Sequence, residues 1–348
     1  MGDGMRRWLL LVGLVGCALA TLARAQQVPA TASPTQAEPV PITDMAPMIV
    51  SGVQPGPGLW KVTAPDGHVL WVLGTLTPLP KRMDWQSREV EAAIDQSQEL
   101  LLPPTMSLDT GRGMFRNLFL LPALFKAIKN PDGKQLQDVV PASEYARWRV
   151  LKARYMGGDQ SVERRRPIFA ALELYKDAMR RSGLSTDNVV ADRVEKLAKR
   201  ADLKITPVVS TVKLEDPKAA IKEFQRTGLE DRTCFARTLD VLEHEIDAMR
   251  LQANAWAMGD VEALRVAPQA SQYAVCQTAI GESAIARKLG LNDLRERSLQ
   301  LWLEKAESAL AHNSSTIALL PMGLVLRKGN LMDALRAKGY TVQAPGEY

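Results

Sequence analysis

Two runs, Leu59-Trp60-Lys61-Val62-Thr63-Ala64 and His68-Val69-Leu70-Trp71-Val72-Leu73, decide how this chain folds. The first run alternates apolar and polar residues, which is typical of a strand with one solvated face. Pro65-Asp66-Gly67 between them has the residues of a turn. The second run is almost wholly apolar, as in a strand buried on both faces. The sequence therefore predicts a β-hairpin whose second strand lies inside a sheet.

A helix and a strand follow this hairpin. Ser87 can cap a helix whose first turn carries Glu89 and Glu91, with Val90, Ala93, Ile94 and Ser97 along one side. Glu99-Leu100-Leu101-Leu102 then indicates a short buried strand. We expect Pro103-Pro104 to end that strand, because proline cannot donate to a sheet ladder.

The middle of the chain, from about 113 to 310, is mostly helical in its apolar period. The clearest stripe has alternating steps of three and four residues: Leu239, Leu242, Ile246, Met249, Ala253 and Trp256. This stripe predicts one helix that ends near Gly259-Asp260. Lys204 to Val209 is β-like instead and predicts a strand standing alone among the helices.

The end of the chain predicts a second strand–loop–helix–strand unit. Residues 316–320 read as a strand, a loop runs to Gly329, Asn330 caps a helix over 331–337, and 340–342 form a last strand. We therefore expect an α/β or α+β fold in a single domain. Its sheet is built from both ends of the chain, and helices of the mostly helical middle pack on it.

The first 25 residues are typical of a signal peptide. Arg6 and Arg7 precede an apolar run from Trp8 to Ala20, which is shorter than the roughly 18–20 residues that span a bilayer. Ala23-Arg24-Ala25 is a small-x-small cleavage site, so we expect a mature N-terminus near Gln26 and a periplasmic or secreted protein.

A lipid anchor is the alternative at this end of the chain. Leu14-Val15-Gly16-Cys17 could be a lipobox, which would tether the protein to a membrane through Cys17. The apolar run continues past Cys17, which favours simple cleavage. Residues 26–57 are rich in proline and predict a disordered linker, so the folded domain is expected over 58–348.

Charge and cysteine content limit the partners. The formal net charge is +5, and the basic stretches at 164–166 and 193–204 are interleaved with acidic residues and have few aromatics. This pattern indicates a solvated helix face and argues against nucleic-acid binding. Cys234 and Cys276 remain after signal cleavage, and we expect a disulfide between them, which an oxidising compartment permits. Two buried thiols are the alternative.

Two loops are candidates for a binding site, because each follows a buried strand and precedes a helix. They are Gly74-Thr75-Leu76-Thr77-Pro78-Leu79-Pro80 and Pro321-Met322-Gly323-Leu324. α/β folds hold ligands in loops of this kind. Gly74, Thr75, Thr77 and Pro80 are therefore candidate cleft residues, and ordinary connecting turns are the alternative.

The order of several short motifs resembles the TraB/GumN family, which is related to the Tiki membrane proteins. The resemblance covers roughly residues 58–345 and rests on these pieces: Leu59-Trp60-Lys61-Val62, Val72 to Pro80, Trp85, Gly133-Lys134-Gln135-Leu136 with Val140-Pro141, Arg166-Pro167, Gly183-Leu184, Ala255-Trp256 with Gly259-Asp260, Glu296-Arg297, and Leu335 to Val342. Through it Arg297 joins the candidate cleft residues.

The resemblance implies a metal-dependent hydrolase with two Gly-x-x-His motifs and a glutamate that ends the strand after the first helix. These groups suit a divalent metal that activates water. The chain departs from the family at each of these positions, which read Thr77, Pro103 and either Gly323 or Leu324. A further acidic position falls in Val209-Ser210-Thr211.

The remaining residues offer little replacement for these ligands. The chain has three histidines, His68, His244 and His312, and none is near either loop in sequence. We expect all three at the solvated surface. Thr77 and Asp84 could hold a hard cation only weakly, since one hydroxyl and one carboxylate fall short of a full shell.

We therefore expect no cofactor, although the family would suggest a divalent metal. The leading hypothesis is a pseudoenzyme of the bacterial cell envelope that binds a peptide, glycan or protein without catalysis. The alternative is a metal-dependent hydrolase or peptidase of the TraB/Tiki type that uses non-standard ligands. A role in assembling envelope polysaccharide would rest on family analogy alone.

Overall fold

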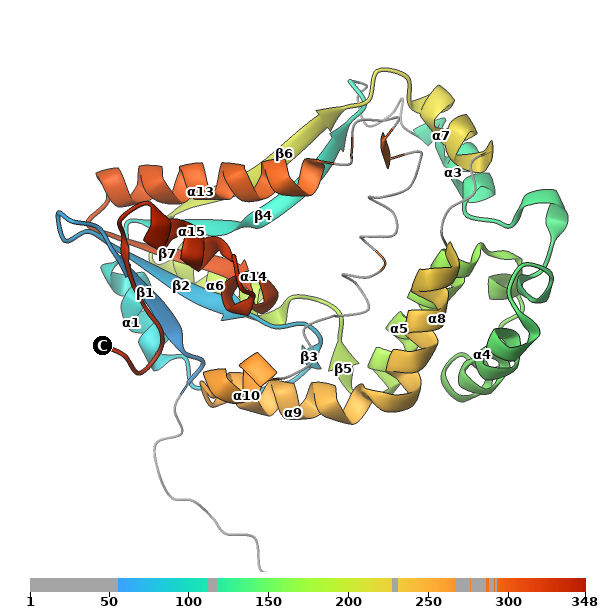
Figure 1. Ribbon diagram of the computed structural model, residues 1–348, viewed down its shortest axis with the longest axis horizontal. Coiled ribbons are helices and arrows are strands. Elements are labelled where there is room, and N and C mark those ends of the chain that lie inside the picture. The colour runs from blue at the N-terminus through green and yellow to red at the C-terminus, as the bar shows by residue number, and fades with distance from the viewer. Residues whose placement is uncertain are drawn as a thin grey trace, which may run out of the picture. The chain divides into compact units, whose positions relative to one another are not determined.

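The computed structural model describes residues 56–111, 118–226, 231–266, 276, 286–287, 291 and 293–348. The expected signal peptide, Cys17 and nearly all of the expected linker lie outside these residues. One compact unit, Gly52–Tyr348, contains every element described below (Figure 1). Within the described residues, no helix is both long enough and apolar enough to cross a membrane.

The strands form one large sheet and one small one. The six-stranded sheet has the order β6-β4-β7-β2-β1-β8, and β3 pairs with β5 in a separate two-stranded sheet. The strand bounds are β1 Leu59–Thr63, β2 Val69–Thr75, β3 Leu79–Pro80, β4 Glu99–Asp109, β5 Leu184–Ser185, β6 Lys204–Lys213, β7 Ser315–Pro321 and β8 Thr341–Gln343. The large sheet is thus mixed: β6, β4, β7 and β2 are parallel, and β1 is antiparallel to both β2 and β8.

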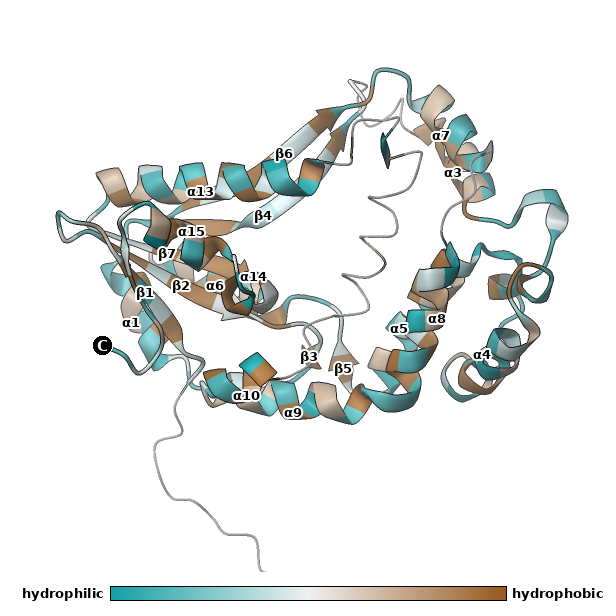
Figure 2. Cartoon of the chain, in the orientation of Figure 1, coloured by the Kyte–Doolittle hydropathy of each residue, from teal (hydrophilic) through white to brown (hydrophobic). Residues whose placement is uncertain are grey.

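The helices come mainly from the middle of the chain, as expected. Their bounds are α1 Arg88–Gln96, α3 Leu121–Ala127, α4 Ala142–Tyr155, α5 Pro167–Arg181, α6 Val189–Arg200, α7 Pro217–Arg226, α8 Asp231–His244, α9 Ile246–Ala257, α10 Val261–Val266, α13 Leu294–His312, α14 Met322–Leu326 and α15 Leu331–Ala337. In Figure 1, α13 lies in front of the large sheet, and α1 and α6 lie behind it. Bands of hydrophilic and hydrophobic residues alternate along α13 in Figure 2, as burying one helix face requires.

The predicted hairpin and its place in the sheet are confirmed. β1 pairs with β2 from Leu59↔Leu73 to Thr63↔Val69. Every β2 residue from Val72 to Thr75 is buried, because β7 covers the other edge of the strand and helices cover its faces. Val69 and Trp71 are half-buried. The mixed sheet built from both ends of the chain is therefore correct, with β6 added from the middle.

The expectation that Pro103-Pro104 ends a strand is wrong. β4 continues through both prolines to Asp109, and its register against β6 shifts between Leu101 and Pro104. The partners Leu101↔Thr206 and Pro104↔Val208 leave one extra residue in β4, which is a bulge. β7 pairs with β4 only as far as Leu101, so the prolines occupy a stretch that has one neighbouring strand.

The predicted single helix over 239–256 is also wrong, because the chain turns at Glu245 between α8 and α9. Leu239 and Leu242 pack in a helical core with α4 and α5, whereas Ala253 and Trp256 pack in the core around the sheet. The residues of this one apolar stripe therefore pack in two separate hydrophobic cores. Figure 1 shows the two helices running in clearly different directions, as this division requires.

Three smaller differences concern local elements. The strand at 204–209 extends to Lys213 and pairs with β4 at the edge of the large sheet, so it does not stand alone. The Ser87 side chain makes no capping bond to backbone; it donates to the carboxylate of Glu91 and accepts from Arg193 at 2.9 Å. The loop after β7 contains the short helix α14.

The predicted C-terminal unit is confirmed in its helix and its last strand. The Asn330 side chain accepts a hydrogen bond from the backbone N–H of Asp333 at 2.8 Å, which caps α15. β8 then pairs with β1 at the edge of the sheet, opposite β6.

Candidate functional site

The expected ligand positions lie toward the carboxyl ends of three neighbouring strands of the large sheet. β4, β7 and β2 are adjacent and parallel, so their carboxyl ends lie on the same side. Thr75 at the end of β2 pairs with Pro321 at the end of β7, and Leu101 of β4 pairs with Ala318. Thr77, Pro103 and the pair Gly323 and Leu324 therefore follow three adjacent strand segments. We call this region the carboxyl edge.

Gly74 and Thr75 are the last two residues of β2 and are buried at the carboxyl edge. The indole Nε1 of Trp256 donates to the carbonyl oxygen of Gly74 at 2.6 Å. The hydroxyl of Thr75 donates to the carbonyl oxygen of Leu320 at 3.3 Å and accepts from Asn188 at 3.5 Å. Gly74 thus connects β2 to α9, and Thr75 connects it to β7 and to Asn188.

Gly74 also has no room for a side chain. A Cβ built at this position would lie 2.6 Å from Met322 Cε and 3.4 Å from Trp60 Cζ3. Glycine is favoured here because the Met322 side chain of α14 packs closely against β2, and a larger residue would have to displace it. The packing of Met322 against β2 therefore accounts for a glycine at position 74.

Thr77 and Pro80 differ in their surroundings. The Thr77 side chain is exposed, and so is Asp84. Pro80 is half-buried and pairs with Leu184 in the small β3–β5 sheet. The two residues thus lie on the loop that leaves β2, with Thr77 on its solvent side.

The expected ligand positions within β4 and after β7 provide no side-chain ligand atom. Pro103 is half-buried inside the continuing strand β4. Gly323 and Leu324 are half-buried in α14, and a Cβ at Gly323 would meet nothing within 4 Å. A larger residue at position 323 would therefore fit without a clash.

Arg297 approaches the carboxyl edge from a different element. α13 ends at His312, just before β7 begins at Ser315, so the first turns of this helix lie toward the carboxyl ends of the strands. Arg297 is in those turns and is exposed, and its guanidinium forms an ion pair with Asp293 at 2.9 Å. The fold thus brings it to the same side of the sheet as the loops.

The histidines lie elsewhere. His244 and His312 are exposed, as expected. His68 differs from the expectation: it is half-buried, and its Nδ1 lies 2.7 Å from the carbonyl oxygen of Leu310. This contact fixes the hairpin turn against the end of α13, on the side of the sheet away from the carboxyl edge.

The donor set at the carboxyl edge does not fit a divalent transition metal. Thr77 supplies one neutral hydroxyl, and Pro103, Gly323 and Leu324 supply no side-chain donor. Sites of this kind generally use about three protein ligands, from imidazole, thiolate or carboxylate groups. Throughout the described residues, no three His, Cys, Asp or Glu side chains gather closely enough to hold a metal ion.

Comparison with known families identifies the family of the chain. The model of the TraB/PrgY/gumN family matches residues 58–344. The chain belongs to this family. No curated protein and no solved structure matches this chain. Family membership therefore rests on the match over most of the chain, and the residues at the carboxyl edge must be interpreted from their own chemistry.

One piece of the TraB/PrgY/gumN resemblance, Arg166-Pro167, has a structural role in the helical core. The buried guanidinium of Arg166 donates to Asp231 at 2.9 Å and lies 5.0 Å from the centre of the Phe224 ring. Burial raises the pKa of Asp231, and Arg166 offsets part of that effect. This ion pair is remote in sequence from both loops and connects α5 to α8.

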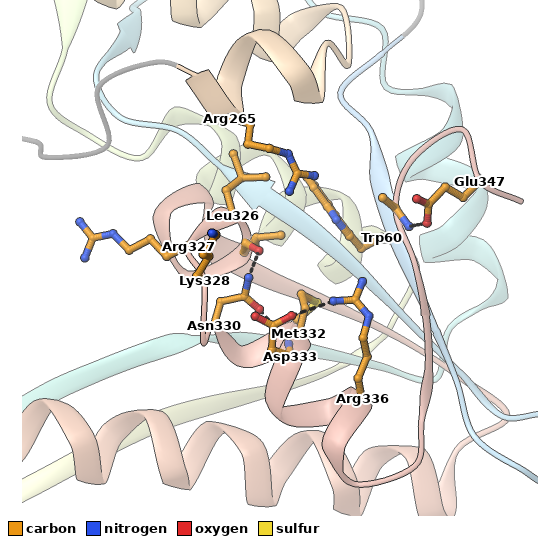
Figure 3. A pocket seen from close by; sticks show the side chains of 12 residues that line it. Trp60, Arg265, Leu326, Arg327, Lys328, Asn330, Met332, Asp333, Arg336 and Glu347 are labelled. Atoms are coloured by element: carbon orange, nitrogen blue, oxygen red, sulfur yellow. Dashed lines mark hydrogen bonds and ion pairs between the residues drawn. The ribbon is translucent and has the colours of Figure 1, made fainter.

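A pocket that the sequence did not predict lies beside α14, the helix that contains Gly323 and Leu324. It has a volume of about 320 Å³ and lies between β1, α10, α14, α15 and the C-terminal residues (Figure 3). Trp60, Arg265, Lys328 and Arg336 are among its lining residues, and none of the expected cleft residues is. Arg327 and Lys328 are adjacent in the sequence, but two neighbouring cations do not by themselves predict a pocket.

Proposed function

We propose that this protein is an exported, non-catalytic member of the TraB/PrgY/gumN family that binds a peptide, glycan or protein at the carboxyl edge. The observation that carries the proposal is the donor set there: one exposed threonine, a proline, and a glycine followed by leucine. Loss of a single ligand would only change metal affinity. Loss of all three removes the Lewis acid and the activated water together.

The scaffold of the carboxyl edge does not depend on a metal. Trp256 bonds to Gly74, Thr75 bonds to Leu320, and the Nδ2 of Asn330 donates to the carbonyl oxygen of Val325 at 2.6 Å. These contacts connect the two loops to β7, α9 and α15. A binding surface can therefore persist in the absence of the family's chemistry.

The first prediction concerns metal content and activity. After incubation with manganese, cobalt or zinc and desalting, elemental analysis should find well below one equivalent of metal, because the donors are absent. A peptide-cleavage assay should give the same background rate with and without chelator. Thr77→Ala should leave both results unchanged, as should the control Thr341→Ala in the remote strand β8.

One equivalent of tightly held metal would contradict the proposal. So would chelator-sensitive cleavage that Thr77→Ala abolishes and Thr341→Ala does not. The first result would show a metal site at odds with the donor set, and the second would establish the hydrolase alternative and identify Thr77 as part of its site.

The second prediction concerns export. The secreted protein should begin near Gln26 and lack lipid, because the apolar run continues beyond Cys17 and closes on Ala23-Arg24-Ala25. Intact mass spectrometry of the protein purified from the envelope fraction measures this directly. A mature chain that begins at a diacylated Cys17 would show that the protein is a lipoprotein.

A further inference from the structure

Four of the 12 residues that line the pocket beside α14 are cations, and two are acidic. Arg265 comes from α10, Lys328 from the loop after α14, and Arg336 from α15. Arg327 also lines the pocket, but Figure 3 shows its side chain pointing away from the other side chains drawn. Three cations from three separate parts of the chain therefore surround one opening.

The two acidic residues of the pocket are already engaged. Asp333 Oδ1 accepts from Arg336 at 2.9 Å, and its Oδ2 accepts from the backbone N–H of Gly329 at 2.9 Å. Glu347 Oε2 accepts from the backbone N–H of Ala344 at 2.7 Å. Both carboxylates thus hold local backbone in place and do not fully neutralise the cations.

The cations keep donors available for a ligand. Arg265 has one weak ion pair, 3.5 Å from Glu262, and both side chains are largely exposed. Arg336 uses one nitrogen for Asp333 and another for the carbonyl oxygen of Val342 at 3.4 Å, which leaves further N–H groups of its five. No carboxylate lies within 4.0 Å of the Lys328 ammonium in the described part of the chain.

The pocket size restricts the ligand. A volume of about 320 Å³ is at the lower end of the range for small-molecule sites. Arg265 of α10 and Arg336 of α15 line the same pocket, and in the view of Figure 3 their side chains extend toward it from above and from below. Two guanidinium groups in this arrangement suit a planar carboxylate or a phosphate, which each can bind in a bidentate manner.

We propose that this pocket binds a small organic anion through a carboxylate or phosphate group, held between Arg265 and Arg336 with Lys328 adding positive charge. The inference is independent of the proposed function, because none of Thr77, Pro103, Gly323 and Leu324 lines the pocket. It would hold for a metalloenzyme as well as for a pseudoenzyme.

The test is isothermal titration calorimetry of the mature protein with inorganic phosphate, with galacturonate, and with uncharged galactose as the matched neutral sugar. We expect binding of phosphate or galacturonate that weakens as sodium chloride is added, and no binding of galactose. The anion that binds more tightly shows whether the pocket prefers phosphate or carboxylate. Arg265→Gln should weaken that binding about tenfold, since a hydrogen bond to a charged group is lost.

Matched controls separate a specific site from general attraction. Arg295→Gln and Lys305→Gln remove single exposed charges on α13 and should leave the affinity within about twofold of the unchanged protein. Arg336→Lys keeps the positive charge but loses the planar guanidinium group that can donate two parallel hydrogen bonds. It serves as the second variant, and lysine is chosen because Arg336 also forms an ion pair with Asp333 that a neutral residue would remove. Thermal melts by circular dichroism check that each variant folds.

Three outcomes would overturn the proposal. They are no detectable binding of either anion at millimolar concentration, equal weakening by Arg295→Gln and Arg265→Gln, and galactose binding as tight as galacturonate binding. The second outcome would show that the net positive charge alone attracts anions.

Discussion

At the scale of single residues, Glu99 is a buried carboxylate with a full set of donors. It accepts hydrogen bonds from Thr206 and from Asn313 at 2.9 Å, and Lys204 lies 3.3 Å away. Burial by itself raises the pKa of Glu99, but the hydrogen bonds and the charge of Lys204 outweigh it and lower this pKa below its ordinary value of 4.5. Glu99 thus joins the starts of β4 and β6 to the turn before β7.

The third prediction follows from the sign of this pKa shift. A carboxylate whose pKa is lower in the folded state contributes stability above its unfolded pKa, and that stability is lost as the pH falls through the folded pKa. Glu99→Gln should therefore reduce the free energy of unfolding by about 1–3 kcal/mol at pH 7. The difference from the unchanged protein should shrink as the pH falls below about 4.5.

Urea unfolding measured from pH 7 to pH 3 checks this, with Glu89→Gln in the exposed first turn of α1 as the control. A destabilisation by Glu99→Gln that stays constant over this range would show that the charge of Glu99 is unimportant.

At the scale of elements, the approach of β2 to α14 sets the shape of the carboxyl edge. Met322 is buried, and its Cε and Sδ lie 2.6 Å and 2.8 Å from the place of a Cβ on Gly74. Because these atoms end a flexible side chain, an added methyl group would displace Met322 before it moved the backbone.

The fourth prediction is a pair of coupled substitutions at this contact. Gly74→Ala should destabilise the protein by about 1–3 kcal/mol through overpacking. In a Met322→Ala background the same change should cost less, because the smaller side chain leaves room. A double-mutant cycle from chemical unfolding measures the coupling. Strict additivity would mean that Met322 is not what excludes a side chain at position 74.

At the scale of the whole molecule, a disulfide joins distant parts of the chain. Cys234 and Cys276 are bonded as the sequence analysis expected, with their Cα atoms 4.7 Å apart, and both are buried. They form a small core with Ile168 of α5. The bond therefore holds Cys276 against Cys234 of α8, beside Ile168 of α5.

The fifth prediction is that this bond contributes to stability. It closes a loop of 42 residues, which corresponds to roughly 4 kcal/mol on the chain-entropy model. Cys234→Ala with Cys276→Ala should lower the free energy of unfolding by about that amount, and reductant should have no further effect on this variant. Two free thiols in the unchanged protein, titrated under denaturing and non-reducing conditions, would show that the bond does not form.

The sequence by itself determined the elements that depend on local physics. The hairpin at 59–73, the helix after Asn330 and the last strand follow from residue alternation, helix period and capping, which act over a few neighbours. Family membership follows in the same way from short motifs in a fixed order. The residue types at Thr77, Pro103, Gly323 and Leu324 can also be read directly from the sequence, and none of them carries an imidazole or a carboxylate.

Only the tertiary structure decided where the apolar stripe over 239–256 breaks and how β4 passes Pro103-Pro104. Each depends on packing between parts of the chain that local periodicity does not encode: two separate cores in the first case, and a bulge against β6 in the second. The same holds for the basic pocket. Arg265, Lys328 and Arg336 look like ordinary surface cations in the sequence, and only the folding of α10 against the end of the chain gathers their charges around one cavity.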